Sequence, residues 1–222
     1  MEAECYVVID AFRATTTIAT LFARGLSTLT ACARIEDAYR LKAEANAVLF
    51  GEVHGLPPEG FDHGNSPVEA SLLEVAGRDA VLFTTNGTAA LVGVAARGPV
   101  YSGSFANAEA VAEAVRGYAS VALVCAGNVG GLAFSLEDFA AAGAIVRALA
   151  AKNDALQAGD SARLAMKTLP EEARNSHHAG VLRSLGLDAD IDFALALDTA
   201  SVAPRVVAHG DGWARLQAGS GQ

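Results

Sequence analysis

The sequence predicts an α/β protein: a mostly parallel sheet with helices on both faces, followed by a helix-rich C-terminal portion. Short runs rich in Val, Ile, Leu and Phe alternate with Ala-rich segments from the first residues to Cys125, which is the pattern of strand–helix units in a parallel sheet. These runs are apolar throughout, as expected of strands that are covered on both faces. From Ser135 onward the segments read as helical instead.

Strands and helices are expected to alternate in the first part of the chain. The apolar runs predict strands over residues 5–9, 27–32, 48–50, 80–84, 99–102 and 121–125. The segments between them predict helices over residues 15–24, 35–46, 87–96 and 106–116, and one that begins at Ser66-Pro67. Gly25 is expected to end the first helix, whereas Ser66 suits an N-cap and Pro67 the first helical position.

The C-terminal portion is expected to be mainly helical. Helices are predicted over residues 136–151, 154–168, 173–185 and 188–197, with a break at Pro170. A brief strand over residues 205–208 and a tail containing Trp213 are expected to follow. We expect a single domain over residues 1–222, in which residues from about 135 to 200 could form a helical lobe.

Composition and charge exclude several classes of protein. The 222 residues are 52% hydrophobic and 18% charged, which suits a folded domain with a sizeable core rather than a disordered chain. The net charge of −9 argues against a nucleic-acid partner, because such proteins usually carry a basic face. We expect the partner to be a small anionic molecule, and a homo-oligomer would not be surprising.

The cysteines and the apolar runs indicate where the protein works. Cys5, Cys32 and Cys125 are widely spaced and form neither a zinc pattern nor a disulfide framework, which favours a reducing compartment. No apolar run approaches the ~20 residues that cross a bilayer, and no signal peptide is evident at the start. The sequence therefore predicts a cytoplasmic protein with no membrane partner.

The first predicted strand runs into a polar turn with several candidate site residues. Asp10 ends the strand, Arg13 lies in the turn, and Thr15, Thr16 and Thr17 open the helix. The unpaired N–H groups of a helix N-terminus suit a phosphate, and Arg13 could add a bidentate contact. Asp10 could hold a metal or act as a base or nucleophile. Alternatively, Thr15 only caps the helix while Asp10 and Arg13 pair with each other.

A second candidate turn follows the strand predicted at 80–84. Thr85, Asn86, Gly87 and Thr88 lie between this strand and the next helix. Gly87 would let the backbone approach a ligand closely, and the hydroxyls could bind an anion. Asn-Gly is also common in ordinary turns, so this motif alone is a weak signal. A Gly-rich loop follows the strand at 121–125, and its Gly127 is a further candidate to bind substrate, but the loop has no dinucleotide or P-loop spacing.

The loop over residues 51–67 gathers polar side chains in a Gly- and Pro-rich segment. Glu52 follows a strand directly, so its carboxylate is expected to face the site, and Asn65 and Ser66 are candidates to bind substrate. Magnesium takes one or two carboxylates together with water and phosphate oxygens. Asp10 and Glu52 are therefore the predicted metal ligands and, with Arg13, the predicted catalytic residues.

Two further acidic and basic motifs have simpler explanations. Glu137 and Asp138 lie just after Ser135 at a predicted helix start, where negative charge is favourable in any case. His177 and His178 precede another apolar helical stretch, and one of them could reach the site as a general acid.

These segments, in this order, resemble the 2-phosphosulfolactate phosphatase family. The resemblance rests on VVIDAFRATTTIAT, GEVHGLPPEGFDHGNSPVE, FTTNGTAAL, VCAGNVGGLAFSLEDFAAAG and SHHAGVLRSLGLDADIDFALALD. It implies an α/β fold, Mg²⁺ as cofactor, and hydrolysis of 2-phosphosulfolactate to 3-sulfolactate and phosphate in coenzyme M biosynthesis. Val53 and His54 follow Glu52 where the family usually has Arg, which removes a contact for one anion of the substrate. A non-catalytic module that binds a small phosphorylated or sulfonated anion is the alternative.

Overall fold

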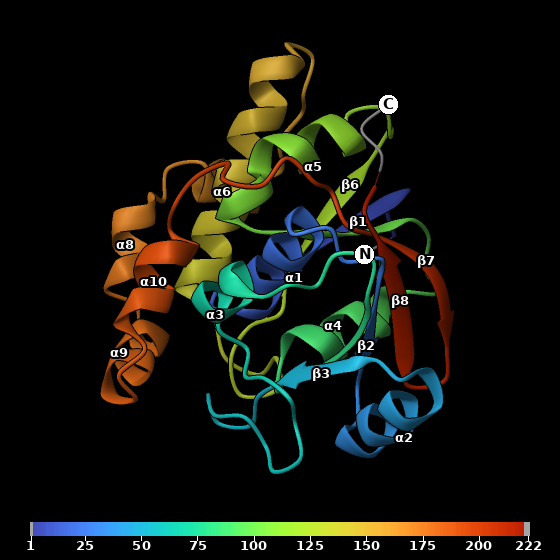
Figure 1. Ribbon diagram of the computed structural model, residues 1–222. Coiled ribbons are helices and arrows are strands. Elements are labelled where there is room, and N and C mark those ends of the chain that lie inside the picture. The colour runs from blue at the N-terminus through green and yellow to red at the C-terminus, as the bar shows by residue number, and fades with distance from the viewer. Residues whose placement is uncertain (1, 220–222) are drawn as a thin grey trace.

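The computed structural model describes residues 2–219, and its centre is one eight-stranded mixed sheet (Figure 1). The strands are β1 (Cys5–Ile9), β2 (Thr28–Cys32), β3 (Val48–Gly51), β4 (Asp79–Phe83), β5 (Val100–Gly103), β6 (Val121–Cys125), β7 (Arg205–Gly210) and β8 (Trp213–Gln217). They lie in the order β3-β4-β2-β8-β7-β5-β1-β6. The predicted α/β class is confirmed.

The sheet is parallel on its two sides and antiparallel in its middle. On one side β1 pairs in parallel with β5 and β6, and on the other β4 pairs in parallel with β2 and β3. The hairpin of β7 and β8 lies between these groups and runs antiparallel to both neighbours. The tail around Trp213, for which no strand was predicted, is therefore a central strand.

Helices cover both faces of the sheet, as predicted. They are α1 (Ala14–Ala23), α2 (Ile35–Ala45), α3 (Pro67–Leu72), α4 (Gly87–Val94), the 3-10 helix η1 (Phe105–Asn107), α5 (Ala108–Val115), α6 (Leu136–Lys152), α7 (Asp160–Ala165), α8 (Pro170–Arg174), α9 (His177–Ser184) and α10 (Asp188–Ala194). The side chains of β1 show the two layers. Tyr6 and Val8 pack with α1 and α4, whereas Val7 and Ile9 pack with α5 and α6.

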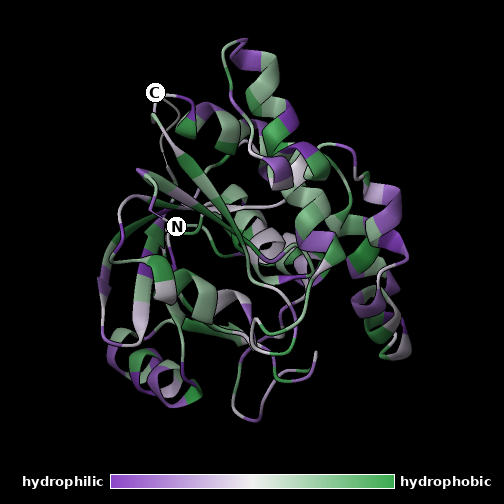
Figure 2. Ribbon diagram, turned by 180° about the vertical axis from the view of Figure 1, so that it is seen from behind, coloured by the Kyte–Doolittle hydropathy of each residue, from purple (hydrophilic) through white to green (hydrophobic). Residues whose placement is uncertain are grey.

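The apolar residues are concentrated in the strands and in the helix faces that cover them. Figure 2 shows the central strands mostly green and the purple, hydrophilic residues gathered on the outer helices. Apolar area removed from water is the main driving force for such a core. Among residues 2–219, no helix combines the length and the apolar character that a membrane span requires.

The C-terminal helices are shorter than predicted. Of the helix expected over residues 154–168, only α7 forms, and the helix expected over 173–185 is divided into α8 and α9. Ser176 accounts for the division because its hydroxyl accepts a hydrogen bond from the Ala179 N–H and caps α9. Pro170 is the first residue of α8, a position that needs no backbone donor. The single-domain boundary at 1–222 stays a prediction.

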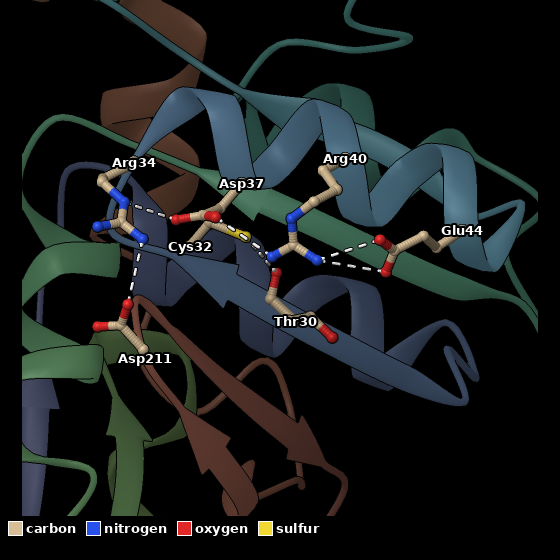
Figure 3. A network of polar contacts seen from close by, with 7 residues as sticks. All are labelled: Thr30, Cys32, Arg34, Asp37, Arg40, Glu44 and Asp211. Carbon is tan, nitrogen blue, oxygen red and sulfur yellow. Dashed lines mark hydrogen bonds and ion pairs between the residues drawn. The ribbon is translucent and has the colours of Figure 1, made fainter.

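A surface network connects α2 to the hairpin turn, as Figure 3 shows. Arg34 pairs with Asp37 at 2.8 Å and with Asp211 at 3.5 Å, and Arg40 pairs with Asp37 and Glu44, both at 3.2 Å. The two arginines are half exposed, so water and salt screen these pairs. The network orients α2 on the sheet and lies apart from the residues described next.

Candidate active site

The polar turns identified in the sequence meet at one edge of the sheet. Asp10 follows the carboxyl end of β1, Glu52 follows β3, and Thr84 to Gly87 follow β4. The loop after β6 leads from the same edge to Glu137 at the start of α6. Ligands of α/β proteins bind outside the carboxyl ends of the strands, so this edge is the candidate site.

Asp10 lies at the centre of the site and is only 8% exposed. Its Oδ1 accepts a hydrogen bond from the Ala14 N–H at 3.3 Å, and the Gly87 N–H also faces its carboxylate. Burial, together with the negative charges of Glu52 and Glu137, raises the pKa of Asp10 to about 7, although the two amides act in the opposite direction. A nearby cation would stabilise the ionised form of a carboxyl group in this setting.

Glu52 connects two turns through its carboxylate. Its Oε1 accepts a hydrogen bond from the Thr85 N–H at 2.8 Å, and its Oε2 accepts one from the Gly55 N–H at 2.7 Å. Glu52 is 9% exposed and close enough to Asp10 to affect the pKa of that carboxyl. The structure therefore brings together the two residues predicted to ligate a metal.

Arg13 pairs with Asp190 and not with Asp10, so the Asp10–Arg13 pair that the sequence left open is not formed. Its Nη1 is 2.8 Å from Asp190 Oδ2, and both side chains are 3% exposed. Its Nη2 donates to the Gly55 carbonyl at 2.7 Å. Because the Gly55 N–H donates to Glu52, the backbone of this one residue links Arg13 to Glu52.

Asp138 joins the turn that contains Asp10 to the loop after β6. Its Oδ1 accepts a hydrogen bond from the Ala11 N–H at 2.8 Å, and its Oδ2 accepts one from the Gly127 N–H at 3.0 Å. Burial raises the pKa of Asp138, and the charge of Asp10 adds to this shift. The neighbouring Glu137 is 2% exposed, and its buried Oε2 has no hydrogen-bond partner.

From the sequence, Glu137 and Asp138 were explained by their place at a helix start alone. Both do lie in the first turn of α6, behind the Ser135 cap. Their burial and their effect on Asp10 were missed, because acidic residues are common in the first turn of any helix. The Gly-rich loop directly before them was the only signal that could have drawn them to the site.

The threonines of the first turn support the backbone. Thr15, Thr16 and Thr17 are fully buried. Their hydroxyls donate to the carbonyls of Asp10, Ala11 and Asn65 at 2.9 to 3.0 Å. Thr15 Oγ1 also accepts from the Asp10 N–H, but no side chain caps α1 at its N-cap residue Arg13, so Thr15 does not have the capping role that the sequence left open. Contact of these hydroxyls with a substrate gains no support from this arrangement and stays a prediction.

The second turn is held in a similar way. Thr88 is fully buried, and its hydroxyl donates to the Thr84 carbonyl at 3.0 Å. The Thr85 N–H donates a hydrogen bond to Glu52, and Asn86 Oδ1 accepts one from the Gly130 N–H at 2.8 Å. Gly87 contacts Asp10 directly, because a Cβ built at residue 87 would lie 2.5 Å from Asp10 Oδ2. The close backbone approach seen here is to Asp10, and the approach to a ligand that the sequence predicted for this glycine stays a prediction.

A cavity of about 230 Å³ lies beside the loop over residues 51–67, and Asp10, Glu52 and Glu137 are not among the residues that line it. Arg13, Asn65 and Ser66 line it. Asn65 is 3% exposed and its buried Oδ1 has no hydrogen-bond partner, while the Ser66 hydroxyl caps α3 by accepting from the Glu69 N–H. The cavity thus joins three predicted site residues from two distant segments.

His178 is the histidine that lies near the carboxylates. Burial lowers its pKa, against the charges of Glu137 and Glu52, while Arg13 adds to the lowering. A neutral imidazole beside a carboxylate cluster can accept or donate a proton. His63 is engaged elsewhere, because its Nδ1 is 2.7 Å from Glu69 Oε1.

The donor set fits a magnesium ion that keeps other oxygen ligands. Within residues 2–219, no three His, Cys, Asp or Glu side chains are placed to hold an ion by themselves. Magnesium commonly takes only one or two carboxylates, with water and phosphate oxygens completing its shell. Asp10 and Glu52 supply that number, and Glu137, whose Oε2 has no hydrogen-bond partner, is close enough for its charge to raise the pKa of Asp10.

The fold and site together define an α/β protein with buried carboxylates at the carboxyl ends of its strands. A family model described as 2-phosphosulpholactate phosphatase matches residues 1–209. A protein of Thermotoga maritima named probable 2-phosphosulfolactate phosphatase is 38% identical over 93% of this chain and 91% of its own length. A Deinococcus radiodurans protein of the same name is 42% identical over 92% and 88%.

The chain belongs to the 2-phosphosulfolactate phosphatase family, a family of phosphoric monoester hydrolases. The resemblance noted in the sequence is thereby confirmed over nearly the whole chain.

Proposed function

We propose that this protein is a magnesium-dependent phosphatase that hydrolyses 2-phosphosulfolactate to 3-sulfolactate and phosphate. Family membership supports the reaction class. The single structural observation that carries the proposal is the pair Asp10 and Glu52, two buried carboxylates at the carboxyl edge that are close enough for the charge of Glu52 to raise the pKa of Asp10. In this proposal the protein acts in the cytoplasm, in coenzyme M biosynthesis.

Magnesium, when bound by Asp10 and Glu52, would polarise the phosphoryl group and lower the pKa of a bound water. The other groups bind and orient. Arg13 is a cation at an otherwise acidic site, and its planar fork suits a phosphate or sulfonate oxygen. His178, placed near the carboxylates, could protonate the leaving alkoxide oxygen. Burial of these groups makes each interaction stronger than it would be in water.

Phosphate release from a panel of small monoesters tests the proposal directly. The panel contains 2-phosphosulfolactate and phospholactate, each measured with magnesium and with EDTA. Turnover that is highest for 2-phosphosulfolactate and disappears with EDTA is expected. Release that persists in EDTA would contradict the metal requirement, and no release from any ester by the folded protein would favour the anion-binding module.

Asp10→Asn is the first variant to measure in this assay. It keeps the size of the side chain but removes the charge that would hold the cation, so a loss of at least about 100-fold in kcat is expected. Asp154→Asn is the matched control, because Asp154 is exposed and lies in the connection between α6 and α7. Near-normal turnover by Asp10→Asn would remove Asp10 from the mechanism.

A further inference from the structure

Asp190 makes a buried ion pair with the arginine of the candidate site. Its Oδ2 lies 2.8 Å from Arg13 Nη1, and each side chain is 3% exposed. The two residues are 177 positions apart in the chain and come from the turn before α1 and from α10. A buried pair of this kind rarely adds net stability compared with apolar residues, so a role in arranging the site is the better explanation.

The second oxygen of Asp190 binds another residue of the cavity. The Ser66 hydroxyl donates to Asp190 Oδ1 at 2.5 Å. Ser66 is also the N-cap of α3, where its oxygen accepts from the Glu69 N–H. One carboxylate therefore fixes the turn after β1 and the end of the loop over residues 51–67 at the same time.

Arg13 has few other restraints. Apart from Asp190, its guanidinium donates only to the Gly55 carbonyl among the described residues. Its remaining N–H groups are available where Arg13, Ser66 and Leu187 line the cavity of about 230 Å³. An arginine side chain with a single hydrogen bond would keep much rotational freedom. Asp190 accepts a second hydrogen bond from Arg13, and the two contacts together fix the plane of its guanidinium.

We propose that Asp190 is a positioning residue that holds the Arg13 guanidinium toward the cavity so that it can bind an anionic oxygen of the substrate. The inference rests on the proposed function, in which Arg13 binds such an oxygen. It assigns a task to α10, an element that the sequence placed in the helical portion without any role in the site.

Asp190→Asn tests this role, because it removes the charge and keeps the shape. A decrease of about 100-fold in kcat/KM is expected, carried mainly by a rise in KM because Arg13 would bind the substrate in the ground state as well. A purely structural role would lower the amount of active enzyme and leave KM unchanged. An unchanged KM would therefore overturn the proposal.

Asp192→Asn is the matched control. Asp192 lies on the same helix, its side chain is 65% exposed, and it pairs with the exposed Arg174. Its removal is expected to change kcat/KM by less than about twofold. If Asp190→Asn does not fold, Ser66→Ala removes the hydroxyl that donates to Oδ1, together with the N-cap of α3. A rise of about threefold in KM is then expected, and an unchanged KM in that variant would also count against the role.

A double-mutant cycle with Arg13→Gln separates action through Arg13 from an independent effect. If Asp190 acts through Arg13, adding Asp190→Asn to Arg13→Gln is expected to change kcat/KM by less than about threefold. Losses that multiply would overturn the inference.

Binding of inorganic phosphate, measured by calorimetry on the same variants, does not depend on turnover. Weaker binding in Asp190→Asn but not in Asp192→Asn would support the inference even if the wild-type protein released no phosphate from any ester. Equal binding in all the variants would overturn it, whether or not the enzyme proves to be a phosphatase.

Discussion

Gly87 lies against Asp10 so closely that no side chain fits between them. A Cβ at residue 87 would lie 2.5 Å from Asp10 Oδ2 and 2.7 Å from the Ala14 Cβ. The first residue of α4 and the turn after β1 are thus in backbone-to-side-chain contact. This contact sets both the position of the Asp10 carboxylate and the access of the Gly87 N–H to it.

Gly87→Ala is therefore expected to inactivate the enzyme. The added methyl group must push the Asp10 carboxylate or the start of α4 aside, and overpacking of this kind costs about 1–3 kcal/mol. Displacement of a carboxylate by about 1 Å is expected to lower kcat about 100-fold. Phosphate release and thermal unfolding together check the prediction.

Gly93→Ala is the matched control for Gly87→Ala. Gly93 lies in the same helix, and nothing lies within 4 Å of a Cβ built there. Alanine is the better helix former, so a gain of up to about 1 kcal/mol with full activity is expected. Wild-type turnover in Gly87→Ala would show that the Asp10 carboxylate tolerates displacement.

The pKa of Asp10 predicts how stability changes with pH in the metal-free protein. It is raised from its ordinary value of 3.8 to about 7, so between these values the folded state holds a proton that the unfolded state has lost. This stabilisation is complete below about pH 4 and is lost as the pH rises through about 7. The difference corresponds to about 4 kcal/mol.

Asp10→Asn is expected to flatten that dependence, because the amide does not titrate. Urea unfolding in EDTA at several values between pH 5 and 8 should give a smaller loss of stability than in the wild type. Asp138, whose pKa is also raised, stays titratable and keeps part of the slope. Asp154→Asn should follow the wild-type curve; an equally steep slope in Asp10→Asn would mean that Asp10 is ionised throughout.

The sequence could predict those site residues that follow a strand directly. Asp10 and Glu52 were found because the carboxyl ends of parallel strands meet at one edge. Asp190 was not found, because its partners Arg13 and Ser66 are more than 100 residues away and no local pattern reports such a contact. The threonine hydroxyls could not be oriented either, since a Thr near a helix start can face a ligand or bond its own backbone.

The topology was predictable only in its parallel parts. Alternating strands and helices indicated the units around β1 and β4. The place of the β7–β8 hairpin, between β2 and β5, depends on which strand edges remain unpaired when the rest has folded. Alternation in short strands such as Trp213–Gln217 shows one buried face but not the neighbours.

Asp138 is expected to matter for activity through the two loops that it joins. Asp138→Ala removes the acceptors of the Ala11 and Gly127 N–H groups and leaves the buried Ala11 donor and the half-buried Gly127 donor without a partner. Each such loss costs about 1–3 kcal/mol, and the Asp10 turn should become mobile. A decrease of about tenfold or more in kcat, with a lower melting temperature, is expected.

Asp160→Ala is the control that separates this role from helix capping. Asp160 also lies in the first turn of its helix, α7, but it is exposed. Loss of its charge should cost at most about 1 kcal/mol and leave kcat unchanged. If both variants behaved alike, the effect of Asp138 would be that of an ordinary acidic residue at a helix start.

Magnesium is expected to stabilise the protein through Glu52. An ion that binds only the folded state raises stability by mass action, by about 2.7 kcal/mol when its concentration is 100 times its Kd. Thermal unfolding with increasing MgCl₂ should show a rise in the wild type and a much smaller rise in Glu52→Gln. The amide keeps an oxygen for one of the N–H groups of Thr85 and Gly55 but loses the charge that attracts the cation.

Glu59→Gln provides the comparison, because Glu59 is an exposed carboxylate in the same loop. Its backbone carbonyl, rather than its side chain, accepts the Tyr39 hydroxyl, so the wild-type response to magnesium is expected. A response that survives in Glu52→Gln would move the cation to Asp10 and the unpartnered Glu137 oxygen. A response lost in both variants would show that the loop as a whole, and not one carboxylate, determines binding.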